Sequence, residues 1–169
     1  MKKVEVYFDY TCPYCNQGIG EFFEILERLP EVEVDWIPAE VSPYPEEVPV
    51  HTDKAIQVMY SVKEQGGDVK LFQKLMFEDC FEKDLKVDDP DVLTDAAVQC
   101  GADKVQVLKD LEDEKFAQQV CDNGMKAWEE LELEAVPSYR IGEEILGSAG
   151  GVLVDKGELE EFIREKALS

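Results

Sequence analysis

Basic residues are scarce in this chain of 169 residues, and so is histidine. Lysine and arginine together number 17 against 39 aspartates and glutamates, which gives a formal net charge of −22. Such a charge repels phosphate backbones and anionic membrane surfaces, so we expect neither nucleic acid nor a membrane as a partner. The acidic residues form pairs and short runs along the chain, as on a solvated surface, and adaptation to high salt is the alternative source of this acidity. His51 is the only histidine, and we interpret it as structural or exposed rather than catalytic.

Long apolar runs are also missing. No stretch is long enough to span a bilayer, and Met1-Lys2-Lys3 leads directly into a strand-like pattern rather than into the apolar core of a secretion signal. We therefore predict a cytoplasmic protein. The five cysteines are an odd number, which argues against a secreted scaffold built on paired disulfides. The length of the chain suits one solid core with an added subdomain.

Two of the cysteines, Cys12 and Cys15, stand where a strand pattern gives way to a helix pattern. Residues 4–8 carry alternating apolar side chains, as a strand does, and the apolar residues after the motif recur at helical spacing, namely Phe22, Ile25, Leu26 and Leu29. Pro13 suits the first turn of a helix, where a backbone N–H would have no partner. A Cys12 thiolate at this position faces free backbone N–H groups and the positive end of the helix dipole. The pattern therefore predicts a lowered pKa and a nucleophilic sulfur at Cys12.

The spacing of the motif predicts a second role for Cys15. One helical turn after Cys12, its sulfur is expected near the first sulfur but deeper in the fold, so it can attack a mixed disulfide at Cys12 and release the substrate. The alternative is half of a zinc site, because Cys-x-x-Cys also supplies two metal ligands. No second Cys-x-x-Cys or Cys/His pair follows, so we favour redox chemistry and expect no metal site. Cys80, Cys100 and Cys121 lack ligand spacing, and we interpret them as small apolar residues.

The residues after the first helix predict a second strand and then a helical block. Residues 32–36 alternate as a strand, which we expect to lie parallel to the first strand through a right-handed crossover. Residues 38–49 contain four prolines and no regular period, which predicts a linker over the surface. Apolar stripes at helical spacing fill residues 50–133, which we expect to form an all-helical insertion.

Strand patterns return after this insertion. Residues 136–141 and 144–147 flank a turn at Gly142 and predict a β-hairpin, which a last helix follows. The order β-α-β, helical insertion, β-β-α is that of a thioredoxin-like fold. We therefore predict an α/β protein whose thioredoxin-like domain consists of residues 1–49 and 134–169, interrupted by the insertion.

Four sets of residues, spread along nearly the whole chain, match the pattern of one known family. They are Asp9 three residues before Cys12-Pro13-Tyr14-Cys15; Leu71-Phe72 through Phe77; Asp88 to Leu93 with Cys100-Gly101; and Ala135 to Tyr139 with Ile141-Gly142 and Gly147 to Gly150. In this combination the chain resembles the DsbA family of thiol-disulfide oxidoreductases, closest to its cytosolic, FrnE-like branch. The resemblance implies Cys12 and Cys15 as the catalytic pair and a substrate-binding surface made of Pro13, Tyr14, Val136 and Pro137.

By the same resemblance, Pro137 forms a cis peptide bond beside the cysteines and holds the Val136 backbone ready to pair with an extended substrate peptide. The alternative is an ordinary trans proline at the first residue of a strand. Pro13-Tyr14 is the dipeptide of many glutaredoxins rather than the Pro-His of strongly oxidising periplasmic members, so the direction of electron flow stays open. Val6 stands where those members keep a buried glutamate, which leaves Asp9 as the nearest acid. Asp9 is either a proton relay for Cys15 or an acid that caps the end of a strand.

Three functions fit these residues. The leading one is disulfide exchange with protein or small-molecule thiols by a disulfide oxidoreductase or isomerase. The alternative is a glutathione-dependent isomerase or transferase of the kappa or 2-hydroxychromene-2-carboxylate isomerase type, although such relatives usually carry serine at the first motif position and lack the resolving cysteine. The third is a non-enzymatic module that binds a partner or a metal at Cys12 and Cys15. We expect no resident cofactor, glutathione as a candidate co-substrate, and thiols or disulfides as partners; the oligomeric state stays open.

Overall fold

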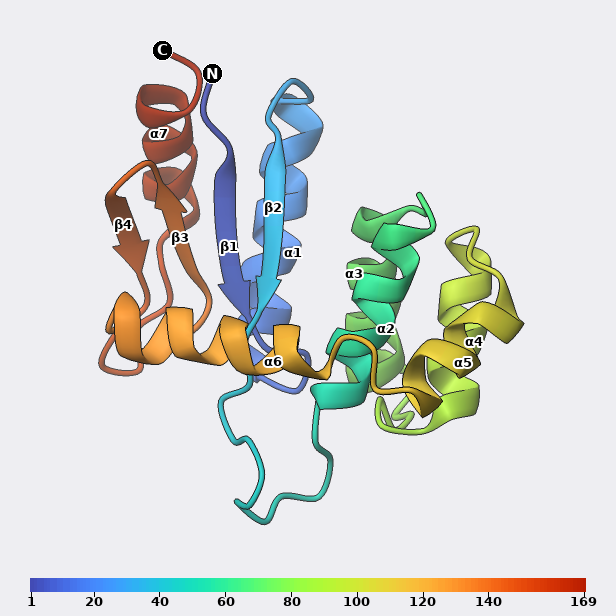
Figure 1. Cartoon of the computed structure of the whole chain (residues 1–169). Coiled ribbons are helices and arrows are strands. Elements are labelled where there is room, and N and C mark those ends of the chain that lie inside the picture. Colours follow the sequence, from blue (N-terminus) through green and yellow to red (C-terminus); the bar gives the residue numbers. More distant parts are fainter. The chain divides into compact units, whose positions relative to one another are not determined.

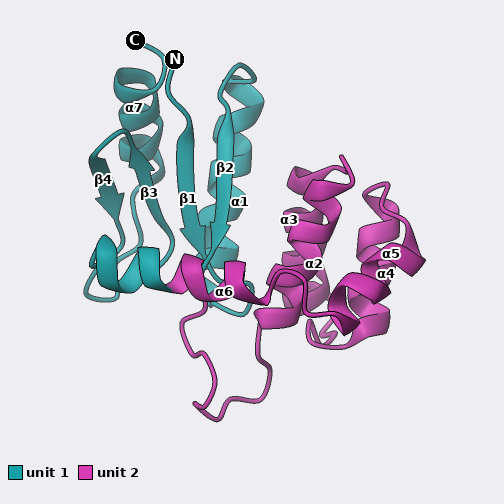
Figure 2. Cartoon of the chain, in the orientation of Figure 1, with its two compact units in different colours: residues 1–39, 125–169 teal, residues 40–124 magenta.

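The computed structural model describes residues 1–169, and the chain divides into two compact units (Figures 1 and 2). Unit 1 consists of residues 1–39 and 125–169, and unit 2 consists of residues 40–124. The pattern of the sequence put the insertion at residues 50–133, so both boundaries lie earlier than we predicted. The second boundary moves because residues 125–133 group with the sheet, as the ion pair between Lys126 and Glu5 illustrates. A contact between residues so far apart leaves no mark in local periodicity.

Unit 1 contains a four-stranded sheet in the order β2-β1-β3-β4. β1 (Val4–Phe8) pairs in parallel with β2 (Val34–Pro38) and antiparallel with β3 (Ser138–Ile141), and β4 (Glu144–Gly147) pairs antiparallel with β3. α1 (Pro13–Arg28) connects β1 to β2, and α7 (Lys156–Lys166) follows the hairpin and contacts α1. The predicted order β-α-β, insertion, β-β-α is confirmed, as are the parallel pair and the hairpin.

One face of the sheet packs against α1. Val6 of β1 lies between Trp36 of β2 and Tyr139 of β3, and all three side chains are buried. Phe22 of α1 covers this row, with its ring 5.7 Å from that of Trp36 and 5.3 Å from that of Tyr139. Each fully buried apolar side chain of this size contributes about 1.5–3 kcal/mol. The aromatic layer therefore fixes α1, and with it the cysteine motif, against the sheet.

The other face of the sheet carries a polar cluster, because side chains alternate along a strand. Glu5 of β1 accepts hydrogen bonds from the Tyr7 hydroxyl at 2.7 Å, from Lys126 Nζ at 2.9 Å and from Arg140 Nη1 at 3.0 Å. Burial acts to raise the pKa of Glu5, but these hydrogen bonds and the charges of Lys126 and Arg140 outweigh it and lower the pKa. Lys126 belongs to η2, the π-helical segment Met125–Glu130. The cluster thus fastens η2 to the sheet.

Unit 2 is helical. Its helices are α2 (Asp53–Glu64), α3 (Val69–Phe77), the π-helical η1 (Glu78–Glu82), α4 (Pro90–Gln99), α5 (Lys104–Glu112) and α6 (Ala117–Gly124). α2 contacts α3, α4, α5 and α6 and so forms the centre of the unit. Three helices begin at an aspartate whose carboxylate accepts a hydrogen bond from a backbone N–H, namely at Asp68, Asp89 and Asp103.

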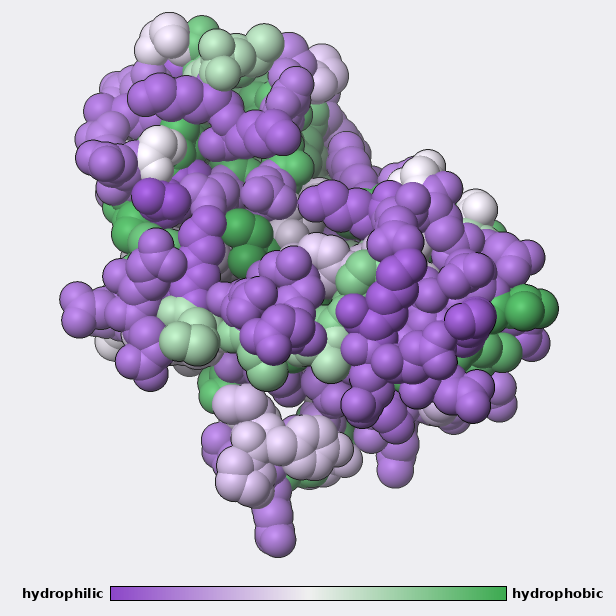
Figure 3. All heavy atoms as spheres, viewed as in Figure 1, coloured by the Kyte–Doolittle hydropathy of each residue, from purple (hydrophilic) through white to green (hydrophobic).

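One face of the protein is drawn with all its atoms in Figure 3. It is covered mostly by hydrophilic residues, with smaller hydrophobic areas between them. None of the helices combines the length and the apolar character that crossing a membrane requires.

Candidate active site

Cys12 and Cys15 lie at the turn from β1 into α1. Cys12 is the N-cap residue of α1, with an extended backbone (φ −84°, ψ 119°), and Pro13 is the first helical residue. The backbone N–H of Cys15 donates to Cys12 Sγ at 3.4 Å. The sulfur therefore occupies the place that a serine or aspartate oxygen takes in an ordinary cap. Negative charge on Cys12 is favoured at this end of a helix.

The two thiols differ in burial and in acidity. Cys15 is fully buried, Cys12 is half-buried, and both are free thiols. A hydrogen bond from the Cys15 side chain, helped by the backbone N–H groups of Cys15 and Tyr14, outweighs burial and lowers the pKa of Cys12 to about 7. Burial, followed by the neighbouring Cys12, raises the pKa of Cys15 far above its ordinary value. Near neutral pH, Cys12 is therefore largely available as a thiolate, while Cys15 stays a protonated thiol.

Val136 lies directly beside Cys12. The Cys12 thiol donates to the carbonyl oxygen of Val136 over 3.9 Å, and the Val136–Pro137 peptide bond is cis. Both residues are buried. They precede β3, which begins at Ser138, whereas the sequence pattern placed them within the strand. Two segments far apart in the sequence thus meet at the Cys12 sulfur.

Gly18 of α1 allows this approach, and we missed it in the sequence. A Cβ atom at Gly18 would lie 2.7 Å from Cγ of Pro137 and 3.0 Å from Cδ1 of Leu153, so no larger side chain fits without movement. The hydroxyl of Tyr139 also donates to the Gly18 carbonyl at 3.4 Å. Glycine inside a helix costs about 1 kcal/mol relative to alanine. The sequence has two glycines in this helix, Gly18 and Gly20, so it signals that a close contact is allowed but does not say which glycine makes it.

Asp9 lies in the turn between β1 and the motif and is only 4% exposed. Its backbone N–H donates to Cys15 Sγ at 3.4 Å. The charge of its carboxylate acts to raise the pKa of both Cys12 and Cys15. The structure thus brings Asp9 into electrostatic range of both sulfurs.

Pro13 and Tyr14 lie on the surface, and the Tyr14 side chain is 52% exposed. They therefore form an exposed rim next to the half-buried Cys12. The residues that the sequence pointed to and that the structure brings together in unit 1 are Asp9, Cys12, Pro13, Tyr14, Cys15, Val136 and Pro137.

His51 and the other three cysteines belong to unit 2. The His51 ring stacks on Tyr44 with 3.6 Å between ring centroids. Burial, with the charge of Asp68, raises the pKa of Cys100 to about 11, whereas Cys80 is half-buried and Cys121 is exposed. No three or more histidine, cysteine, aspartate or glutamate side chains come together in a group that could hold a metal ion.

Comparison of the chain with known protein families finds a match to one of them. The family of DsbA-like thioredoxin domains matches residues 3–161. An uncharacterized protein of Bacillus subtilis strain 168, YwbO, is 28% identical over an alignment 195 positions long, gaps included, which covers 94% of this chain and 96% of YwbO. The catalytic domain of Proteus mirabilis ScsC is 26% identical, with a TM-score of 0.66 over 99% of this chain and 84% of that domain.

Two further solved structures share the fold at lower identity. A probable DsbA oxidoreductase from Streptomyces coelicolor has a TM-score of 0.83 at 17% identity, covering 98% of this chain and 90% of its own. BdbD from Bacillus subtilis has a TM-score of 0.71 at 18% identity, covering 99% of this chain and 88% of its own. Because the family match spans nearly the whole chain, this protein belongs to the family of DsbA-like thioredoxin domains.

Proposed function

We propose that the protein is a thiol-disulfide oxidoreductase that exchanges disulfides with protein or small-molecule thiols through Cys12 and Cys15. The observation that carries this proposal is the contrast between the two sulfurs: a half-buried Cys12 with a pKa of about 7, and a fully buried Cys15 whose pKa is raised. A thiolate is the attacking species in disulfide exchange, and the optimal attacking thiol has a pKa near the ambient pH.

The exchange takes two steps. The Cys12 thiolate attacks one sulfur of a substrate disulfide, so a bond forms between Cys12 Sγ and that sulfur while the other substrate sulfur leaves as a thiolate. Cys15 then loses its proton and attacks Cys12 Sγ, which forms the Cys12–Cys15 disulfide and releases the second substrate thiolate. Two electrons pass from the protein to the substrate. Run backwards, the same steps oxidise a substrate dithiol.

The second step needs a base for the Cys15 proton, and Asp9 is our candidate. It is buried, its backbone contacts Cys15 Sγ, and its charge acts on both thiols. We expect Asp9→Asn to slow release of the mixed disulfide by about 100-fold, the lower end of what general acid–base catalysis supplies. The same change removes a charge that raises the pKa of Cys12, so this pKa should fall. Unchanged release, with only the pKa altered, would make Asp9 a cap and not a relay.

The substrate would lie across Cys12 on the surface that Pro13, Tyr14, Val136 and Pro137 provide. Tyr14 offers an exposed aromatic ring, and the Val136 carbonyl oxygen near Cys12 Sγ is an acceptor for the backbone N–H of an extended peptide. We further propose a cytoplasmic, FrnE-like enzyme that works as a reductase or isomerase, with no resident cofactor and with glutathione as co-substrate. The match to a DsbA-like domain does not favour the glutathione-dependent isomerase or transferase.

The test combines turnover with a redox measurement. Wild-type protein should reduce or oxidise disulfide-linked peptides; Cys12→Ser should abolish the reaction, and Cys15→Ser should accumulate a mixed disulfide at Cys12. Cys121→Ser, which alters an exposed thiol of unit 2, is the matched control and should keep full activity. Equilibration with glutathione buffers then gives the Cys12–Cys15 potential and separates an oxidant from a reductase. Full turnover by Cys15→Ser would refute the two-thiol mechanism, and tightly bound zinc in purified protein would favour the metal-binding module.

A further inference from the structure

Ser148 holds the carbonyl group of Pro137. It follows β4 directly and is 6% exposed. Its hydroxyl donates to the Pro137 carbonyl oxygen at 2.8 Å, and its backbone N–H points to the same oxygen at 3.4 Å. The Ser148 Oγ also accepts the backbone N–H of Val154 at 3.3 Å. One side chain therefore links the segment after β4 to the residue that follows Val136.

A second serine holds the carbonyl on the other side of Val136. The Ser138 hydroxyl donates to the Ala135 carbonyl oxygen at 2.7 Å, and Ser138 is 1% exposed. The carbonyls of residues 135 and 137 are thus both bound by serine hydroxyls, while the Val136 carbonyl oxygen lies 3.9 Å from Cys12 Sγ. These bonds hold the peptide groups 135–136 and 137–138. The planar peptide group between them, which carries the Val136 carbonyl, therefore has less freedom to turn.

The same segment also packs on α1 behind the cysteines. The space next to Gly18 is filled by the Pro137 ring and by Leu153, which lies between Ser148 and Val154. Ala149 and Val152 close the intervening turn by mutual backbone hydrogen bonds. The ring of Pro137 is therefore held by packing and its carbonyl by Ser148.

We propose that Ser148 is a positioning residue that aims the Val136 carbonyl toward the space above Cys12, where it receives the backbone of a peptide substrate. This inference rests on the proposed disulfide exchange and adds to it the preference for peptide disulfides over disulfides without a peptide backbone. The groups that set the pKa of Cys12 are Cys15, Tyr14 and Asp9, together with burial, and the long contact to the Val136 carbonyl is not among them. We therefore expect a change at Ser148 to leave the reactivity of Cys12 itself nearly unaltered. Ser148 affects how the peptide substrate is aligned with Cys12.

The test uses Ser148→Thr and Ser148→Val, which have the same shape and differ only in the hydroxyl. In the Val variant we expect the carbonyl carbon-13 shifts of Val136 and Pro137 to move and hydrogen exchange of the Val154 amide to accelerate. We expect kcat/KM for a disulfide-linked peptide to fall about fivefold, the factor that one lost hydrogen bond of average strength corresponds to. The rates with 2-hydroxyethyl disulfide and with iodoacetamide should stay as in the wild type. The Thr variant should behave as the wild type in all of these measurements.

Ser61→Val is the matched control, because Ser61 is another fully buried serine, in unit 2, whose hydroxyl donates to Asp110 at 2.7 Å. It should lower stability without changing the ratio of the rates with peptide and small disulfides. If the branched variants at 148 do not fold, Ser148→Ala makes the same comparison with a smaller side chain. Equal loss with peptide and small disulfides, or unmoved Val136 and Pro137 carbonyl shifts, would overturn the proposal. If the wild type exchanges no disulfide at all, the proposed function fails and the carbonyl shifts alone decide the role of Ser148.

Discussion

The two cysteines of one helical turn have opposite chemistry because their surroundings differ. Cys12 caps α1 and receives hydrogen bonds from Cys15, whereas Cys15 is enclosed by the core. The first environment favours a charged sulfur and the second disfavours it. A single turn of helix thus supplies both thiols of the proposed exchange, the attacking one at Cys12 and the resolving one at Cys15.

The acidity of Cys12 gives the first prediction. Its alkylation rate should rise with pH around a midpoint of about 7, because only the thiolate reacts. Cys100, whose pKa is raised to about 11, should remain unreactive over this range. The measurement is iodoacetamide labelling of the reduced protein at a series of pH values, resolved by mass spectrometry of the individual peptides. A midpoint near 9, the value of an ordinary thiol, would contradict the arrangement at the N-cap.

The same lowered pKa links stability to pH. The folded protein favours the thiolate form of Cys12 more than the unfolded chain does, and this difference adds to the free energy of unfolding. The contribution is fully present above about pH 9 and is lost as the pH falls through about 7. The difference in unfolding free energy between reduced wild type and Cys12→Ser should therefore grow from pH 7 to pH 9. Urea denaturation under reducing conditions measures it. If the difference in unfolding free energy instead shrinks from pH 7 to pH 9, the pKa of Cys12 is not lowered in the folded protein.

Two glycines of α1 make a matched pair for the third prediction. A Cβ at Gly18 would lie 2.7 Å from Pro137, but a Cβ at Gly20 would meet nothing within 4 Å. We expect Gly20→Ala to stabilise the protein by up to about 1 kcal/mol through helix propensity. Gly18→Ala should instead destabilise it by about 1–3 kcal/mol through overpacking, and should slow peptide disulfide exchange because Pro137 has to move. Urea denaturation of both variants tests this. If both variants are stabilised equally, the Pro137 ring moves aside from the new methyl group at little cost.

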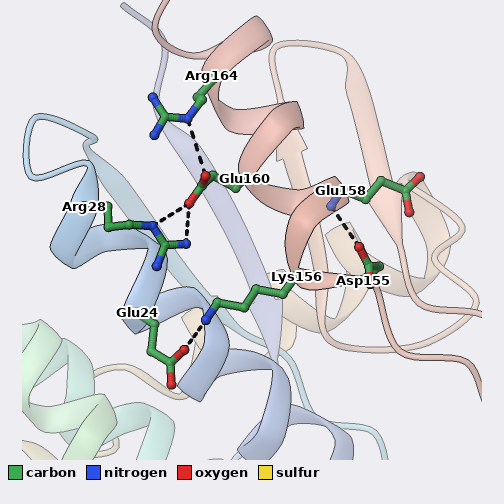
Figure 4. Close-up of polar contacts among 7 residues, drawn as sticks. All are labelled: Glu24, Arg28, Asp155, Lys156, Glu158, Glu160 and Arg164. Atoms are coloured by element: carbon green, nitrogen blue, oxygen red, sulfur yellow. Dashed lines mark hydrogen bonds and ion pairs between the residues drawn. The ribbon is translucent and has the colours of Figure 1, made fainter.

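At the scale of elements, ion pairs link α7 to α1, and Asp155 caps α7 (Figure 4). Lys156 pairs with Glu24, and Arg28 pairs with Glu160, which also lies 3.6 Å from Arg164 Nε. These pairs are solvent-exposed and contribute between 0 and about 1 kcal/mol each. The Asp155 carboxylate, in contrast, accepts the Glu158 backbone N–H at 3.1 Å and satisfies a donor that has no partner within the helix.

The cap should therefore matter more than the ion pairs. Asp155→Ala is expected to lower the free energy of unfolding by about 1 kcal/mol, while Asp155→Asn, which keeps an accepting oxygen, should lose much less. Glu160→Gln should cost less than about 1 kcal/mol, and its effect should vanish at high salt. Denaturation curves at low and high ionic strength separate the two kinds of contribution. A larger, salt-independent cost at Glu160 would contradict this ranking.

At the scale of the whole molecule, the net charge of −22 bears on which disulfides reach Cys12. Long-range fields change the rate at which charged molecules arrive and are screened by salt. We expect the dication cystamine to react at least about tenfold faster than the dianion dithiodiglycolate at low ionic strength. Salt should shrink this ratio, while the rate with neutral 2-hydroxyethyl disulfide stays constant. A ratio that does not depend on salt would point to local contacts instead.

The sequence predicted those features that are set by neighbouring residues. The strand that leads into Cys-Pro-Tyr-Cys, the parallel strand pair and the hairpin all follow from local periodicity and turn residues, and the structure contains them. Contacts between segments that are distant in the sequence could not be predicted from local periodicity. The fit of Gly18 to Pro137, the bond from Ser148 to Pro137 and the union of η2 with the sheet each depend on the folded chain.

The split of unit 1 into residues 1–39 and 125–169 has a consequence during synthesis on the ribosome. Domains emerge and fold from the N-terminus, so the dithiol motif leaves the exit tunnel long before β3, the strand that β1 needs on its second side. A nascent chain therefore carries Cys12 and Cys15 before it carries Val136 and Pro137. Until translation passes those residues, Cys12 has no Val136 carbonyl beside it. The substrate site that we propose therefore exists only after the second part of unit 1 has been made.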